Sequence, residues 1–89
     1  MIRKKIMITR KADDPAKRAV EFVNMVDQFP CEITFQINDA TYSGKSVISM
    51  MVGDFDNQKE LEFVCSGARE EEAMERICDW FDPEHKTVG

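Results

Sequence analysis

Residues 11–23 read KADDPAKRAVEFV, a stretch that passes from a polar loop into an amphipathic helix. Asp14 followed by Pro15 marks the start of the helix. An aspartate accepts a hydrogen bond from the first-turn amides, and a proline at the first helical position removes no donor that the helix uses. Apolar residues then recur at helical spacing, namely Ala19, Phe22, Val23 and Val26. The pattern predicts a helix over about residues 15–28 with one stripe facing a core.

On either side of this helix, alternation of apolar and polar residues predicts strands. The predicted strands span about residues 2–9, 32–38, 41–45 and 60–66. In the second strand Ile33, Phe35 and Ile37 share one face, as Leu61, Phe63 and Cys65 do in the fourth. The turn signal at residues 38–40 predicts that the second and third strands pair antiparallel.

Two more helices complete the pattern. Ser46 as N-cap and Gly53 as terminator predict a short helix over about residues 47–52. A longer amphipathic helix is predicted over about residues 70–82, ended by Pro83. The element order is therefore βαββαβα. We expect a single domain over residues 1–89 of the α+β class. It is an open-faced β-sandwich whose four-stranded antiparallel sheet is covered on one face by helices.

Composition limits the classes of function. The chain has 89 residues, of which 43% are hydrophobic and 33% charged, as in an ordinary globular domain. No apolar run approaches the roughly 20 residues of a membrane span, and the opening residues lack the apolar stretch of a secretory signal. The formal net charge of -5 argues against nucleic acid as a partner. We therefore expect a cytoplasmic protein with no nucleic-acid or membrane partner.

Few residues are suited to chemistry. The three cysteines form no CxxC motif, and the one histidine, His85, lies in a charged tail, so no metal-binding cluster is predicted. Reduced cysteines packed as small hydrophobes are the simplest interpretation. Residues 11–23 contain no histidine, cysteine or serine, and the chain offers no nucleophile and base pair. We expect no enzymatic activity, no metal and no cofactor.

Three stretches in a common register indicate a family. They are RAVEFV at 18–23, GKSVISMM at 44–51 and CSGAREEEAME at 65–75. In this register the chain resembles, without gaps, the histidine-containing phosphocarrier protein family (HPr) of the bacterial sugar phosphotransferase system. The resemblance runs from the first strand to the last helix and implies the family's βαββαβα fold.

The family's phosphoacceptor histidine stands at the start of the first helix, followed two residues later by arginine and then proline. These places hold Pro15, Lys17 and Arg18 here. Phosphohistidine transfer needs an imidazole lone pair at a helix N-terminus, whereas a proline nitrogen in a peptide bond is an amide with a delocalised lone pair. The resemblance therefore implies a chain unable to carry phosphohistidine. An acyl phosphate on Asp13 or Asp14 would need a magnesium pocket of several acids, so helix capping is the favoured role for them.

By the same resemblance, Ser46 stands at the regulatory serine that HPr kinase phosphorylates in some bacteria, with Lys45 directly before it. A phosphate at a helix N-cap meets free amides and the positive end of the helix dipole, and it adds about -1.5 to -2 charges. From its local sequence alone, Ser46 is a plain N-cap, a role worth about 0.5 to 2 kcal/mol. Capping and phosphorylation are compatible, so both roles stay open.

The short helix is more apolar than one core-facing stripe requires, so some of its side chains must be exposed. Exposed aliphatic and methionine side chains mark protein-binding surfaces. In the family, partners dock on this helix and on the first one. The resemblance implies as partner-binding residues Lys17, Val20, Asn24, Lys45, Val47, Ile48 and Met51. The alternative that part of this set closes the core stays open.

Two functions follow as alternatives. In the first, the chain is a non-catalytic regulatory protein of carbon catabolite repression. It is phosphorylated at Ser46 by HPr kinase and binds a transcriptional repressor or a metabolic enzyme. The catabolite-repression HPr-like proteins (Crh) are similar in lacking the histidine and keeping the serine. In the second, it is an unmodified protein-interaction module with no role in the phosphotransferase system. An exposed edge strand allows a monomer or a weak homodimer in either case.

Overall fold

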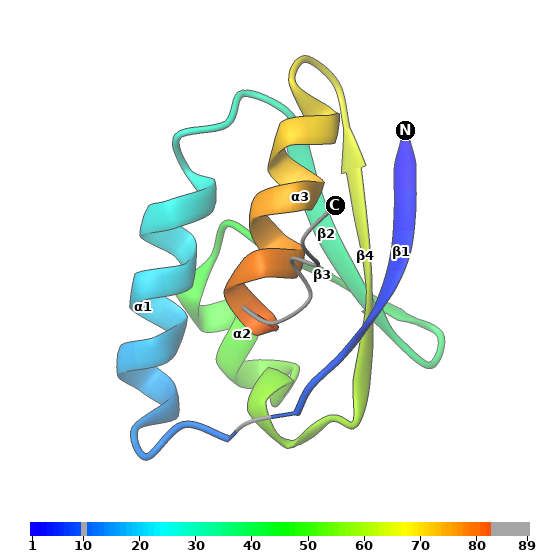
Figure 1. Ribbon diagram of the computed structural model, residues 1–89. Helices are drawn as coiled ribbons and strands as arrows, with labels where there is room; N and C mark the ends of the chain where they lie inside the picture. Colours follow the sequence, from blue (N-terminus) through cyan, green and yellow to red (C-terminus); the bar gives the residue numbers. More distant parts are fainter. Residues whose placement is uncertain (10, 83–89) are drawn as a thin grey trace.

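The computed structural model describes residues 1–9 and 11–82, and Figure 1 shows their arrangement. The elements in chain order are β1 (Ile2–Met7), α1 (Pro15–Val26), β2 (Glu32–Ile37), β3 (Ala40–Ser43), α2 (Val47–Val52), the 3₁₀ helix η1 (Phe55–Asn57), β4 (Glu60–Ser66) and α3 (Glu70–Phe81). The predictions for Pro83 and His85 lie outside the described residues.

The four strands form one antiparallel sheet in the order β1-β4-β2-β3. The helices α1, α2 and α3 lie on the same side of this sheet, and no element within the described part of the chain covers its other side (Figure 1). The register sets Ile33 opposite Cys65 and Phe35 opposite Phe63, so the predicted apolar faces of β2 and β4 coincide. The predicted α+β class, the βαββαβα order and the sheet with one open face are confirmed.

A group of aromatic rings fills the space between the sheet and the helices. The ring of Phe63 lies with its centroid 5.6 Å from each of Phe22, Phe35 and Phe81. All four side chains are almost completely buried. Aromatic pairs at such separations add about 0.5 to 1.5 kcal/mol beyond the burial of their area. Phe63, at the middle of β4, thus joins the sheet to both long helices.

Several element ends differ from the predicted ones. The first strand ends at Met7 instead of residue 9, although the Ile8 N–H still donates to the Lys59 carbonyl at 2.8 Å. The first helix ends at Val26, two residues early, and the last helix ends at Phe81, one residue early. The third strand covers 40–43 instead of 41–45. Helix and strand ends are commonly uncertain by one or two residues, so the sequence pattern alone does not locate the terminal residue.

The segment between α2 and β4 was expected to be a plain loop. It contains η1, in which Phe55 and Asp56 are buried. Asp54 precedes η1 in the left-handed region with φ 52° and is not a glycine. Gln58 N–H donates back to the Phe55 carbonyl at 3.4 Å. The turn is too short to show a helical period, which explains why the sequence pattern did not indicate it.

The three cysteines are free thiols, and all are buried. Burial and the neighbouring thiol of Cys31 raise the pKa of Cys65 to about 12. Burial also raises the pKa of Cys78. Among the described helices, none has the length and apolar character needed to span a membrane.

Cys65 is predicted to resist thiol reagents in the native protein. The thiolate is the nucleophile, and at pH 8 a thiol with a pKa of about 12 is almost fully protonated as well as inaccessible. We expect the disulfide reagent DTNB to release no thiolate from the native protein within minutes at pH 8. All three cysteines should react in guanidinium chloride. Rapid stoichiometric release from the native protein would contradict this account of the core.

Candidate functional site

The start of α1 is closed by its own chain. Asp14 is the N-cap with φ -130° and ψ 91°, and Pro15 is the first helical residue. The Lys17 N–H donates to Asp14 Oδ1 at 3.2 Å, and the Arg18 N–H donates to the Asp14 carbonyl at 3.0 Å. A carboxylate therefore occupies the place where the helix end would hold an incoming anion. The predicted capping role of Asp14 is observed.

Asp56 brings the loop before α1 against η1. The Ala12 N–H lies 3.2 Å from each of the two Asp56 carboxylate oxygens. Arg18 Nη1 donates to Asp56 Oδ1 at 3.2 Å, and the two side chains are 15% and 6% exposed. Asp56 as a whole residue is buried, at 4% exposure, and no other charged or polar residue in the described part of the chain is. The loop, η1 and α1 are thus joined at one carboxylate.

Arg18 also contacts the last helix. Its guanidinium carbon lies 4.9 Å from the Trp80 ring centroid and 5.6 Å from that of Phe81. A guanidinium at these distances over aromatic faces is attracted by the ring quadrupoles. The sequence interpretation treated Arg18 only as a departure from a family pattern and did not find Asp56 or Trp80. The available signal was that Arg18 precedes buried Phe22 by one helical turn, at the border of the apolar stripe.

A shallow hollow of about 520 Å³ opens beside this group. Its lining comes from the loop before α1, the first two turns of α1 and Trp80, and it contains no histidine, cysteine, serine or threonine. Asp13 and Asp14 lie at its rim and are exposed. Among residues 1–9 and 11–82, no three histidine, cysteine, aspartate or glutamate side chains gather closely enough to hold a metal ion. These residues can bind charged groups weakly, but none of them is an activated nucleophile.

Just before α2, the chain at Gly44 approaches β2 closely at Ile33. The Gly44 N–H donates to the Ile33 carbonyl at 2.8 Å, and a Cβ at Gly44 would lie 2.8 Å from Ile33 Cγ2. Ser46 is the N-cap of α2, and its Oγ accepts a hydrogen bond from the Ser49 N–H at 3.2 Å. The predicted capping contact is therefore present, on a half-buried serine. The Lys45 ammonium is held by the chain itself, because it donates a hydrogen bond to the Phe29 carbonyl.

The apolar residues of α2 divide between core and surface. Met50 is fully buried and Val47 packs partly buried against the core, whereas Ile48 and Val52 are 76% and 70% exposed. Met51 and Val20 are 41% and 45% exposed, and Lys17 and Asn24 are exposed. Because α1 and α2 are in contact (Figure 1), these side chains lie on adjacent elements. We call the exposed set Val20, Ile48, Met51 and Val52 the α1/α2 patch. Val52 was not among the predicted partner-binding residues.

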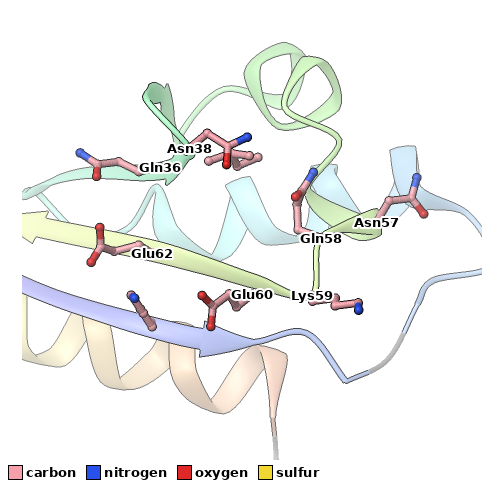
Figure 2. Close-up of a pocket in the computed structure, with 9 residues that line it drawn as sticks. Gln36, Asn38, Asn57, Gln58, Lys59, Glu60 and Glu62 are labelled. Atoms are coloured by element: carbon pink, nitrogen blue, oxygen red, sulfur yellow. The ribbon is translucent and has the colours of Figure 1, made fainter.

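A second hollow, of about 540 Å³, lies on the uncovered face of the sheet (Figure 2). Amide and carboxylate side chains line it, among them Gln36, Asn38, Glu60 and Glu62. The Asn57 and Gln58 amide nitrogens at its edge already donate to Asp54 and to the Gly53 and Asp54 carbonyls, respectively. Lys5 and Lys59 also line this polar hollow, and its lining contains no histidine, cysteine, serine or threonine.

The fold and the helix-terminus site define a class of small phosphocarrier-like domains. The family model described as the PTS HPr component phosphorylation site (PTS-HPr) matches residues 2–82, so the chain belongs to the HPr family of the phosphotransferase system. Members of this family are phosphocarriers and not enzymes, and they act through contacts with other proteins. Among curated proteins, no sequence matches the chain significantly.

Solved structures of the family share the fold at low identity. The HPr-C-His protein of Thermoanaerobacter tengcongensis matches with TM-score 0.84 and 23% identity, over 92% of each chain. HPr of Bacillus anthracis matches with TM-score 0.83 and 21% identity, over 91% of this chain and 96% of that one. Crh of Bacillus subtilis, described as a swapped, intertwined dimer, matches with TM-score 0.66 and 19% identity over 94% and 97%.

The Arg18 and Asp56 pair is predicted to carry more stability than an exposed pair. Asp56→Asn removes the buried carboxylate that pairs with the Arg18 guanidinium and should lower the free energy of unfolding by about 3 kcal/mol, as expected for breaking a buried pair. Glu72→Gln is the matched control, because Glu72 forms an exposed pair with Arg69 at 3.1 Å. Urea denaturation measures both. Equal effects of the two substitutions would contradict the structural role assigned to Asp56.

Proposed function

We propose that this chain is a non-catalytic regulatory protein of the HPr family that cannot carry phosphohistidine. It is phosphorylated at Ser46 and binds a transcriptional regulator or a metabolic enzyme in the bacterial cytoplasm. In this proposal HPr kinase is the modifying partner. The chain acts as a monomer or weak homodimer without cofactor or metal, and it binds neither nucleic acid nor membrane.

The observation that carries the proposal is the first turn of α1. By resemblance to the family pattern, position 15 is the phosphohistidine place, and Pro15 is the first helical residue here. Its nitrogen is an amide and cannot attack a phosphoryl group. The preceding Asp14 carboxylate already accepts from the Lys17 N–H, which an incoming phosphoryl oxygen would otherwise use. Both features act against a phosphoryl group at this end of the helix.

The geometry of α2 supports Ser46 as the modified residue. Its Oγ already faces a first-turn amide, so a phosphate there would keep amide donors within reach and gain the favourable end of the helix dipole. The added charge would lie two residues from Ile48, the most exposed apolar side chain of α2. Modification at Ser46 would thus change the surface that the partner meets without requiring the domain to refold.

The exposed apolar residues favour an alternative function. The α1/α2 patch exposes apolar side chains that can bind a protein whether or not Ser46 is modified. The chain would then be an unmodified interaction module of the HPr fold with no phosphotransferase-system role. The two functions share the α1/α2 patch and differ in the need for phosphate.

Paired phosphorylation assays test the first function. With HPr kinase and ATP, mass spectrometry should show the gain of one phosphate, which Ser46→Ala abolishes and Ser49→Ala retains. With enzyme I and phosphoenolpyruvate, no residue should be labelled, because position 15 offers no lone pair. Labelling by enzyme I would refute the role assigned to Pro15.

Binding by variants of the α1/α2 patch tests the alternative. Ile48→Asp should abolish capture of a pull-down partner, since a carboxylate placed in an apolar contact is desolvated without compensation. Met7→Asp is the matched control, because Met7 is also an exposed apolar residue, at 57%, but lies on β1. If Ser46 resists the kinase while Ile48→Asp still abolishes capture, the unmodified module is the correct function. If Ile48→Asp and the control Met7→Asp both abolish capture, the loss is not specific to the α1/α2 patch, and the patch is not the binding surface in either function.

A further inference from the structure

Among residues 1–9 and 11–82, no strand pairs with the outer edge of β1. β1 pairs with β4 on one side only, and Figure 1 shows no element along its other side. The Ile8 N–H donates to the Lys59 carbonyl at 2.8 Å, so residues 2, 4, 6 and 8 direct their backbone groups toward β4. In an antiparallel ladder the alternate residues Arg3, Lys5 and Met7 then direct their N–H and C=O groups outward. This edge offers regularly spaced donors and acceptors over six residues, without a proline or a bulge.

The charge on this edge is opposite to that of the chain. Arg3, Lys4 and Lys5 are consecutive and exposed, although the formal net charge is -5. Arg3 forms an ion pair with Glu62 at 3.2 Å on the open face, with the two side chains 50% and 25% exposed. Within the described part of the chain, neither Lys4 nor Lys5 forms an ion pair. Glu62, which lies directly opposite Lys5 on β4, balances part of this charge on the open face. β1 itself carries three cations and no carboxylate, so its outer edge attracts negative charge.

Apolar surface lies beside these cations. A hollow of about 230 Å³ runs between β1 and α3 and is lined by residues 4–7, Cys78 and Asp82. Met7 is 57% exposed, whereas Ile6 is buried on the helix side. Because side chains alternate along a strand, Arg3 and Lys5 face the open side of the sheet while Lys4 and Ile6 face the helix side. A segment added here would meet Arg3 and Lys5 on one face and, on the other, a largely apolar hollow whose lining also includes Lys4 and Asp82.

We propose that the β1 edge binds an extended acidic segment of a partner protein, which adds a fifth strand to the sheet. The bound segment alternates acidic residues, which meet Arg3 and Lys5, with apolar residues, which enter the hollow beside Cys78. Strand addition uses main-chain hydrogen bonds for affinity and alternate side chains for specificity. A second copy of β1 does not fit this role, because pairing would set its cations against one another. The opposite edge, β3, has four residues and no charge. The β1 surface is separate from the α1/α2 patch.

Fluorescence anisotropy with a labelled heptapeptide of alternating glutamate and valine tests the proposal. At low salt the peptide should bind, and added salt should weaken binding because the attraction is partly electrostatic. A heptapeptide of the same composition with its glutamates and valines in separate blocks should bind much more weakly, and one of alternating lysine and valine should not bind. Amide exchange followed by NMR should show new protection at Arg3, Lys5 and Met7. A merely electrostatic contact would not produce this pattern.

Variants of Lys5 separate charge from strand pairing. Lys5→Glu should raise the Kd about tenfold by replacing attraction with repulsion, while Lys59→Glu, with the same change in net charge, should leave the Kd nearly unchanged. Lys5→Ala and Lys5→Pro remove the same charge, but only the proline also removes the outward N–H. The proline variant should therefore bind about fivefold more weakly than the alanine variant. Thermal melts establish whether each variant is folded. If Lys5→Pro does not fold, the effect of Lys5→Glu on the Kd remains the test of the proposal.

Three results would overturn the proposal. The first is no binding of the alternating peptide at millimolar concentration, and the second is a Kd that Lys5→Glu does not change. The third is exchange protection that appears on the α1/α2 patch instead of β1. If residues 3, 5 and 7 become protected with increasing protein concentration and no peptide, the occupant is a second copy and the acidic segment is wrong.

Discussion

The buried carboxylate of Asp56 is the constraint on which the functional end of this domain depends. A charged group with little solvent must be given hydrogen bonds by the protein, and here they come from the Ala12 amide and the Arg18 guanidinium. Arg18 in turn lies against Trp80, so the loop before α1, η1 and the last helix are fixed relative to one another. The position of the first turn of α1 follows from these contacts.

Phosphate carriage and this arrangement make competing demands on the same atoms. A helix N-terminus holds a phosphoryl group through free amides and a nearby cation. In this chain the Lys17 amide is bonded to Asp14, the Ala12 amide to Asp56, and the Arg18 cation to Asp56. These three groups hold the loop, η1 and α1 together. Among the described residues, exposed apolar side chains lie on α1 and α2, and three consecutive exposed cations lie on β1.

The fold could be predicted from sequence because the hydrophobic periodicity and the cap and turn residues indicate the same elements along the chain. Apolar and polar residues alternate in 32–37 and 60–66, which specifies two strands. The Asp14-Pro15 start and the Ser46 cap each specify a helix, and the apolar faces of these elements pack against one another. The site was less predictable. Asp56 and Arg18 are far apart in sequence, and a buried ion pair leaves no periodic signal. Surplus apolar residues on α2 indicated exposure, but which of them are exposed depends on how α2 meets the core. The attachment of Lys45 to Phe29 likewise depends on the tertiary path and not on local sequence.

The closed first turn of α1 has a consequence for descent within the family. Exchanging Pro15 for histidine would place an imidazole at the first helical position, but the Asp14 cap, the Ala12–Asp56 hydrogen bond and the Arg18–Trp80 contact would persist. Each of these contacts stabilises the domain, so a substitution that gives up one of them is expected to lower the free energy of unfolding. A change in the chemistry of this helix end is therefore expected to need several coordinated substitutions and not a single one.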